Sequence, residues 1–292
     1  MHCIAPASTS LHDPALLWEG WPKRRRVPMS DCATFRVQEG LGPIVAIGVH
    51  SSRRKWRTWM PDGMRQFMRA EITLVQASRV GDLNEVRALL SKGFDVNSRS
   101  QDGGTALVSA SWTGYLDIVQ ELLSKGANVN LKSIDSGLAG GRTPLIAASR
   151  QGHLKVVNLL LEAGPDVHEK DGEGRDALMR ASYGDYPYVV RALLSKGASP
   201  YAKDPQGYTA LILARSADVT HLLIEAGAEI NARTHSGNTA LMYAVCGEID
   251  LVRALLAAGA HTDIRNDDGE TVLAMATNDK IRALLKRASA DE

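Results

Sequence analysis

The side chains of this chain that could perform acid–base catalysis or bind a metal are too scattered to indicate a site. His168, His235 and His261 are far apart along the sequence, whereas zinc ligands usually come in closely spaced pairs. The chain contains neither a phosphate-binding G-x-x-x-x-G-K-[ST] motif nor a nucleophile motif of the form G-x-S-x-G. We therefore expect a protein that is not an enzyme and that uses no cofactor and no metal ion.

The aspartates and cysteines support the same expectation. One or two aspartates occur at each predicted turn without the close ligand spacing of a calcium loop, so we interpret them as turn formers and helix caps. They are Asp135, Asp166, Asp171, Asp204, Asp267 and Asp268. Cys3, Cys32 and Cys246 are odd in number and widely separated, which predicts no disulfide framework and a reducing compartment, taken to be the cytoplasm.

The chemistry that the chain does offer is recognition, through aromatic rings and arginines at two recurring positions. Such side chains dominate interfaces because they bury a large area with few rotatable bonds or pair with carboxylates. One position ends the first helix of each repeating unit, and the other lies in the turn before that helix. The predicted partner-binding residues are Trp112, Thr113, Arg142, Arg150, Gln151, Arg175, Tyr183, Tyr208, Arg215, His235 and Asn238. The alternative is ordinary surface, where single exposed aromatic residues are common.

These positions recur because the chain is built from a repeating pair of short helices. In the clearest copy, Thr143 is a good N-cap, Pro144 suits the first helical position, and Gly152 can end the helix in a left-handed conformation. Apolar residues at helical spacing over 156–161 then predict a second helix, which Gly164 closes. A pair of this size cannot bury its own apolar face, so it needs neighbours like itself.

The chain supplies seven such pairs, with variable spacing between equivalent positions. The spacing is 38 residues from Thr105 to Thr143 and 30 residues from Thr209 to Thr239. The extra residues fall at 133–141, between two pairs, whereas the deletions fall between the two helices of a pair. Insertions at a fixed place in a stacked repeat lengthen loops on one face, often the binding face. The first pair, from Leu74 on, begins differently from the others.

Residues 71–292 resemble the ankyrin-repeat family. The family's motif T-P-L-x-x-A-A-x-x-G-H-x-x-V-V-x-L-L-L-x-x-G is nearly complete at residues 143–164 and recurs in register. The resemblance implies an all-α repeat fold, a solenoid of about seven helix–turn–helix units with β-turn fingers. It further implies that the fingers and inner helices form a concave surface that binds other proteins, and that His153 is structural.

The sequence departs from the family pattern in two ways. The histidine of the usual Thr-Pro-Leu-His is replaced by apolar residues, which exchanges a hydrogen-bond network for apolar contact: Val108, Ile146, Met179, Ile212 and Met242. The unit that begins at Asp176 lacks the threonine and has Gly184-Asp185 where Gly-His is usual. Pro187 then comes early in its second helix, so we expect a local bend there.

Residues 1–68 form an irregular basic N-terminal extension with a different composition. The first 70 residues hold 11 Lys and Arg against 5 Asp and Glu, and the chain totals of 34 and 33 leave 23 against 28 for the rest. Two interpretations stay open, a flexible arm and an upstream sequence translated in error. Lys23–Arg26 resembles a nuclear-import signal, although such clusters also arise by chance in arginine-rich segments. Trp56 and Trp59, which lie among basic residues, leave binding to nucleic acid as an alternative.

We expect residues 69–292 to be a non-catalytic protein–protein interaction module or scaffold. The partner is another protein, with no membrane involved, and we expect the chain to be monomeric with its first and last helix pairs acting as caps. Two alternatives remain at this stage: a regulator whose basic arm contacts nucleic acid, and a targeting subunit of an enzyme or effector.

Overall fold

The computed structural model describes residues 73–134 and 140–291. The chain divides into two units, Met1–Phe67 and Met68–Glu292, and the described residues all belong to the second. The predictions made for residues 1–68, including the import signal and the basic arm, lie outside the described residues. The predicted domain boundary after residue 68 and the middle of the long loop, 135–139, lie outside them as well.

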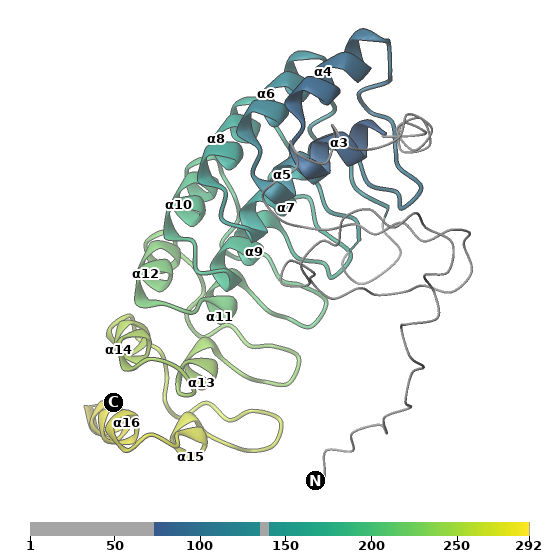
Figure 1. Ribbon diagram of the computed structural model, residues 1–292. Helices are drawn as coiled ribbons and strands as arrows, with labels where there is room; N and C mark the ends of the chain where they lie inside the picture. The colour runs from purple at the N-terminus through teal and green to yellow at the C-terminus, as the bar shows by residue number, and fades with distance from the viewer. Residues whose placement is uncertain (1–72, 135–139, 292) are drawn as a thin grey trace, which may run out of the picture. The chain divides into compact units, whose positions relative to one another are not determined.

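The described part of the chain forms seven helix pairs, as predicted, and the pairs follow one another in a curved stack (Figure 1). The inner helices are α3 (Leu74–Val80), α5 (Ala106–Thr113), α7 (Pro144–Arg150), α9 (Ala177–Tyr183), α11 (Ala210–Leu213), α13 (Ala240–Ala244) and α15 (Val272–Met275). The outer helices are α4 (Leu83–Ser91), α6 (Leu116–Ser124), α8 (Leu154–Glu162), α10 (Pro187–Ser195), α12 (Ala217–Glu225), α14 (Ile249–Ala257) and α16 (Asp279–Asp291). Between these helices the described residues contain only isolated β-bridges, so the predicted all-α repeat fold is confirmed.

The inner helices begin where the sequence places polar caps. The hydroxyls of Thr105, Thr143 and Thr209 each accept the backbone N–H of the residue three positions on, which satisfies one of the free donors of the first turn. The carboxylate of Asp176 does the same for Met179. In the first pair Thr73 caps α3, one position later in the repeat than the other caps, so the first pair does begin differently.

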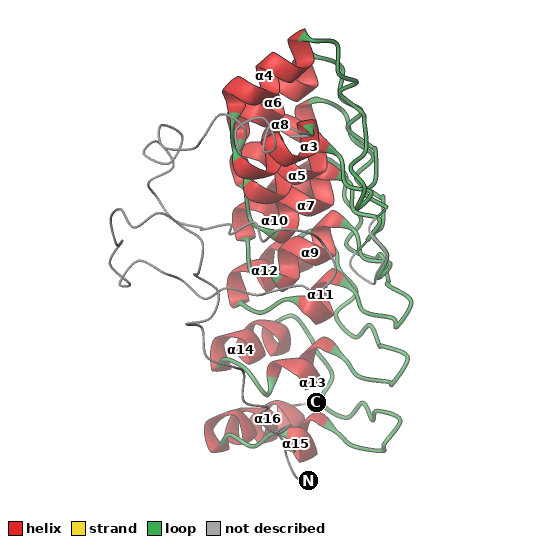
Figure 2. Cartoon of the chain, turned by 45° about the vertical axis from the view of Figure 1, so that its right-hand side comes forward, coloured by secondary structure: helices red, strands yellow, loops and turns green. Residues whose placement is uncertain are grey.

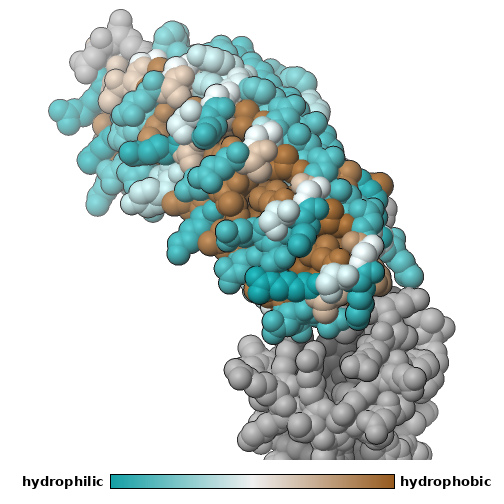
Figure 3. Space-filling model, turned by 90° about the horizontal axis from the view of Figure 1, so that it is seen from above, coloured by the Kyte–Doolittle hydropathy of each residue, from teal (hydrophilic) through white to brown (hydrophobic). Residues whose placement is uncertain are grey.

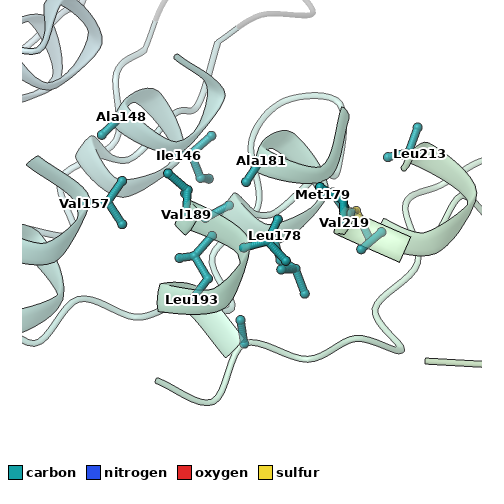
Figure 4. Packing of buried hydrophobic residues seen from close by; sticks show 14 of the residues in the cluster. Ile146, Ala148, Val157, Leu178, Met179, Ala181, Val189, Leu193, Leu213 and Val219 are labelled. Carbon is teal, nitrogen blue, oxygen red and sulfur yellow. The ribbon is translucent and has the colours of Figure 1, made fainter. Parts of the chain in front are cut away.

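The core is one continuous apolar cluster that runs through all seven pairs, from Leu74 to Leu285. Figure 4 shows its middle, where Met179 of α9 and Leu193 of α10 pack against side chains of the neighbouring pairs. The apolar residues at the family's histidine position are all buried, as expected. Full burial of a Leu or Met side chain contributes about 1.5–3 kcal/mol. Because these side chains are buried between consecutive pairs, each pair is stabilised mainly by its neighbours.

The unit at Asp176 differs from its prediction in register. Asp185, with φ 59°, takes the left-handed position that Gly114 and Gly152 hold in their own units, and it is the one non-glycine residue with positive φ among those described. Tyr186, rather than Asp185, therefore stands where the histidine was expected. Pro187 occupies the first turn of α10, which is nine residues long like its neighbours, so the departure is confined to the turn before it.

The deletions also fall elsewhere than predicted. α11, α13 and α15 have four, five and four residues, whereas the four earlier inner helices have seven or eight. The outer helices before α16 all keep nine residues. The missing residues therefore come from the last turn of the inner helices, because the cap of the next outer helix, such as Ser216, follows almost at once.

The loops between pairs gather on one side of the helices as fingers (Figure 2). Neighbouring fingers are joined by backbone hydrogen bonds, for example from the Ile134 N–H to the Gly103 oxygen and from the His235 N–H to the Gln206 oxygen. Pro205 has no N–H to donate at the equivalent position of its finger. No helix of the described segments is long and apolar enough to cross a bilayer.

Candidate partner-binding face

The concave side of the stack is lined by the last turns of the inner helices and by the fingers that precede them (Figure 1). Trp112, at the end of α5, brings together two of the predicted arginines. The guanidinium carbon of Arg142 lies 4.7 Å from the centroid of its ring, and that of Arg150, at the end of α7, lies 5.6 Å away. All three side chains are half-buried. Guanidinium groups at these distances are attracted by the electron-rich face of the indole.

Tyr183, the last residue of α9, and Arg215, which follows α11, form a second stacked couple further along the inner helices. The guanidinium carbon of Arg215 lies 5.0 Å from the centroid of the Tyr183 ring, and Tyr183 is 48% exposed. Four of the predicted residues thus form a row of two stacked couples, Trp112 with Arg150 and Tyr183 with Arg215. Each couple joins one helix pair to the following one.

A third aromatic group lies at the fingers. The guanidinium carbon of Arg175 is 5.7 Å from the Tyr208 ring, and Tyr208 also meets Tyr243 with ring centroids 5.6 Å apart. The two tyrosine hydroxyls are 2.8 Å apart. Desolvation and the hydrogen bond with Tyr208 raise the pKa of Tyr243 to about 12. Tyr243 is not among the residues predicted from the sequence, because partner-binding residues were expected at the end of the inner helix and in the preceding turn, whereas Tyr243 lies within α13.

Arg175 is engaged within the fold. Its Nε donates to Asp204 at 3.0 Å, and its Nη1 lies 3.5 Å from Glu173. Buried Arg180, which the sequence analysis also did not select, donates to Asp171 through Nε at 2.7 Å and lies 3.0 Å from Glu173. Burial opposes ionisation of Glu173, but Arg180, Arg175 and Arg150 together lower its pKa.

The remaining predicted residues have local roles in the structure. The Thr113 hydroxyl donates to the carbonyl oxygens of Ser109 and Ala110 on its own helix, and Gln151 is the C-cap of α7. The Asn238 side-chain oxygen accepts from Asn266 at 3.1 Å. His235 is exposed on its finger.

His153 lies where a structural role requires it. Its Nε2 is 3.1 Å from the carbonyl oxygen of Trp112, and its ring lies over Gly114, leaving no room for a Cβ there. Tyr186 covers Gly152 in the same way. Elsewhere in residues 73–134 and 140–291, no group of three or more His, Cys, Asp or Glu side chains could hold a metal ion.

Apolar side chains also reach the surface of the molecule. In the view from above, they form a continuous area bordered by hydrophilic side chains (Figure 3). Single exposed aromatic residues lie on the outer layer too, where Tyr188 at the start of α10 is 72% exposed. Isolated residues of this kind need no functional explanation, so Tyr188 serves best as a reference for the concave row.

Comparison with known proteins agrees with this architecture. The sequence profile described as ankyrin repeats (3 copies) matches residues 63–133, 132–204, 178–268 and 211–291. No curated protein sequence matches the chain significantly. Among solved structures, the ankyrin repeat domain of Bcl-3, described as a unique member of the IkappaB protein family, is similar with a TM-score of 0.62 and 26% identity, over 74% of this chain and 99% of that one. The human ASB11 ankyrin repeat domain has a TM-score of 0.67 and 24% identity, over 75% of this chain and 98% of that one.

Proposed function

Because the chain belongs to the ankyrin-repeat family, whose domains are in general protein–protein interaction modules, we propose that it binds a partner protein without catalysis, on the concave face. The observation that carries the proposal is the row of two stacked couples along consecutive inner helices, Trp112 with Arg150 and Tyr183 with Arg215. Neither Trp112 nor Tyr183 is among the buried core residues. The core therefore does not require these two large side chains, and they are available for contact with a partner.

The row has the properties of interface hot spots. Aromatic and arginine side chains at the centre of a preformed surface bury a large area and lose little conformational freedom on binding. Here each ring already restrains a guanidinium, so part of the ordering cost of binding is met before the partner arrives. The stack also holds the inner helices rigidly side by side, which favours binding without a large change of shape.

The proposal is tested by combining Trp112→Ala with Tyr183→Ala in the full chain. An affinity pull-down with the unmodified chain first identifies the partner, and binding of that purified partner is then measured by calorimetry. We expect the double variant to bind at least about a hundredfold more weakly, because each lost hot spot typically costs about 2 kcal/mol or more. Circular dichroism and a thermal melt should show that the fold survives.

Tyr188→Ala provides the matched control, because it removes a more exposed aromatic side chain from the outer layer. This variant should bind the partner as the unmodified chain does. Unchanged binding by the Trp112 and Tyr183 double variant would place the interface elsewhere and overturn the proposal.

A further inference from the structure

We infer that the partner presents an acidic segment to the concave face, and that Arg150 and Arg215 each receive one of its carboxylates. This inference rests on the proposed function and names the chemistry of the partner. It starts from a difference among the arginines of this face. Arg175 and Arg180 are matched by carboxylates of their own chain. Arg150 and Arg215 have no carboxylate within ion-pair distance in the described parts of the chain.

The nearby carboxylates are already committed. Glu173 lies 3.0 Å from Arg180 and 3.5 Å from Arg175, and it influences Arg150 only through its longer-range field. Asp185, close in the chain to Tyr183, accepts a hydrogen bond from the Ser216 hydroxyl. Neither of these carboxylates is paired with Arg150 or Arg215, so both guanidinium groups remain able to pair with a carboxylate of the partner.

Stacking prepares both guanidinium groups for a carboxylate. Arg150 lies 5.6 Å from the Trp112 centroid and Arg215 lies 5.0 Å from that of Tyr183. A guanidinium held by an aromatic face retains its N–H edge, and that edge matches the two oxygens of a carboxylate. The Nη1 of Arg150 is buried without a hydrogen-bond partner, so this guanidinium is incompletely satisfied within the chain.

The positions of the two arginines set the spacing of the acidic residues. Arg150 is the last residue of α7 and Arg215 follows α11, so they are two helix pairs apart. Packed helices lie about 8–10 Å apart, which separates the two guanidinium groups by roughly 16–20 Å. An extended peptide covers that distance in about five or six residues. The exposed ring of Tyr183 lies between them along the row, where an apolar side chain of the partner can pack.

The inference is tested with a defined probe. A fluorescein-labelled peptide carries two glutamates six positions apart, with leucine midway and glycine or serine elsewhere, and its binding to the full chain is followed by fluorescence anisotropy. We expect this peptide to bind at least about tenfold more tightly than the same peptide with both glutamates changed to glutamine. Its affinity should fall as salt is raised. Equal binding of the two peptides, or no binding of the glutamate peptide at millimolar concentration, would overturn the inference.

Two double variants of the chain test which arginines bind the glutamate peptide. Arg150→Gln with Arg215→Gln should lower the affinity for the glutamate peptide to that for the glutamine peptide. Arg191→Gln with Arg253→Gln removes the same charge from exposed sites on the outer helices α10 and α14, and should leave the peptide affinity unchanged. An equal loss in the two double variants would mean that net charge alone attracts the peptide, and the assignment to this face would be wrong.

Binding of the natural partner to the same variants distinguishes a failure of this inference from a failure of the proposed function on which it rests. If Trp112→Ala with Tyr183→Ala abolishes partner binding while Arg150→Gln with Arg215→Gln leaves it intact, the acidic segment is wrong and the concave face stands. If neither double variant weakens partner binding, the concave face itself is wrong.

Discussion

The first four helix pairs and the last three share an outer layer but differ in the inner one. Outer helices from α4 to α14 all have nine residues, whereas inner helices shorten from seven or eight residues in α3–α9 to four or five in α11–α15. Trp112, Arg150 and Tyr183 all stand at or near the ends of long inner helices. The candidate partner-binding side chains therefore gather where the inner helices are longest, and the later pairs contribute mainly fingers to the concave face.

The helix ends explain how the two regions tolerate different lengths. In α5 the chain leaves the helix through Gly114, with φ 80°, and the ring of the next unit's His153 lies over that glycine. In α11 it leaves through Ala214, which is extended with ψ 140°, and passes directly to the cap of α12. An extended exit needs no glycine and no covering ring, so the last turn can be deleted without disturbing the outer layer.

Individual fingers are also fixed with different chemistry. In the third and fourth fingers buried carboxylates, Asp171 and Asp204, accept backbone N–H groups of the finger and pair with Arg180 and Arg175. In the fifth finger the neutral hydroxyl of Thr234 accepts the N–H of Asn238. A buried ion pair stabilises its finger only while both partners are present, because a buried ion without its partner is energetically costly.

Arg180→Ala should therefore have the largest effect on stability. It leaves Asp171 buried without its cation, and we expect the free energy of unfolding to fall by about 3–5 kcal/mol. Thr234→Ala removes one neutral hydrogen bond in the other region and should cost about 1 kcal/mol. Urea denaturation followed by circular dichroism measures both. Equal losses would show that the charged and neutral fingers are equivalent and that this contrast between the regions has no energetic meaning.

Gly152→Ala should have the second-largest effect on stability. It changes a glycine at the end of an inner helix that is covered by an aromatic ring of the next unit, and among the described residues only the first region has such covered helix ends. A Cβ at Gly152, with φ 73°, would approach the Tyr186 ring to 2.4 Å. We expect a loss of about 2–4 kcal/mol, from backbone strain together with overpacking. Gly164 has the same φ, 73°, with no atom within 4 Å of an added Cβ, so Gly164→Ala isolates the strain at about 1–2 kcal/mol.

Thermal melts and urea titrations on the two glycine variants give the difference directly. If Gly152→Ala costs no more than Gly164→Ala, the Tyr186 ring moves aside freely and does not hold the helix exit. In that case the long inner helices would owe their last turn to local backbone preference alone.

Much of the fold could be predicted because it depends on local rules that repeat. Polar caps, left-handed glycines and apolar spacing recur along the stack, so an error in one unit is corrected by the others. The features that were missed depend on contacts between units. Arg180 looks like an ordinary surface residue until Asp171 of the preceding finger is placed beside it, and Asp185 takes a conformation usually left to glycine.

The candidate site was predictable only in part for the same reason. Position along the repeat placed Trp112 and Tyr183 at inner-helix ends, but it gave no information on which arginines are already paired. Arg142 and Arg175 look alike in sequence, because each directly precedes the cap of an inner helix. Only the neighbouring units decide that Arg175 is held by Asp204, whereas Arg142 stacks on Trp112.

Asp176→Thr should have the smallest effect, and it tests whether the carboxylate cap of α9 is interchangeable with the threonine caps of the other inner helices. Asp176 caps α9 where Thr209 caps α11, and both accept a backbone N–H at the third following residue. Desolvation of the buried carboxyl raises the pKa of Asp176, although the N–H of Met179 favours its charged form. The folded chain thus holds this proton more tightly than the unfolded chain does. Ionisation of Asp176 therefore lowers stability as pH rises from the unfolded pKa through the folded one.

Threonine keeps the cap and removes the ionisation, so we expect Asp176→Thr to stabilise the chain by about 0.5–2 kcal/mol at neutral pH. Below the unfolded pKa of aspartate, at about pH 3.5, the carboxyl is protonated in both states and the gain should vanish. Urea denaturation of both chains across this pH range measures the difference. A variant that is less stable at neutral pH would mean that the carboxylate forms a stronger cap than the hydroxyl, and that the different cap of α9 has a reason of stability.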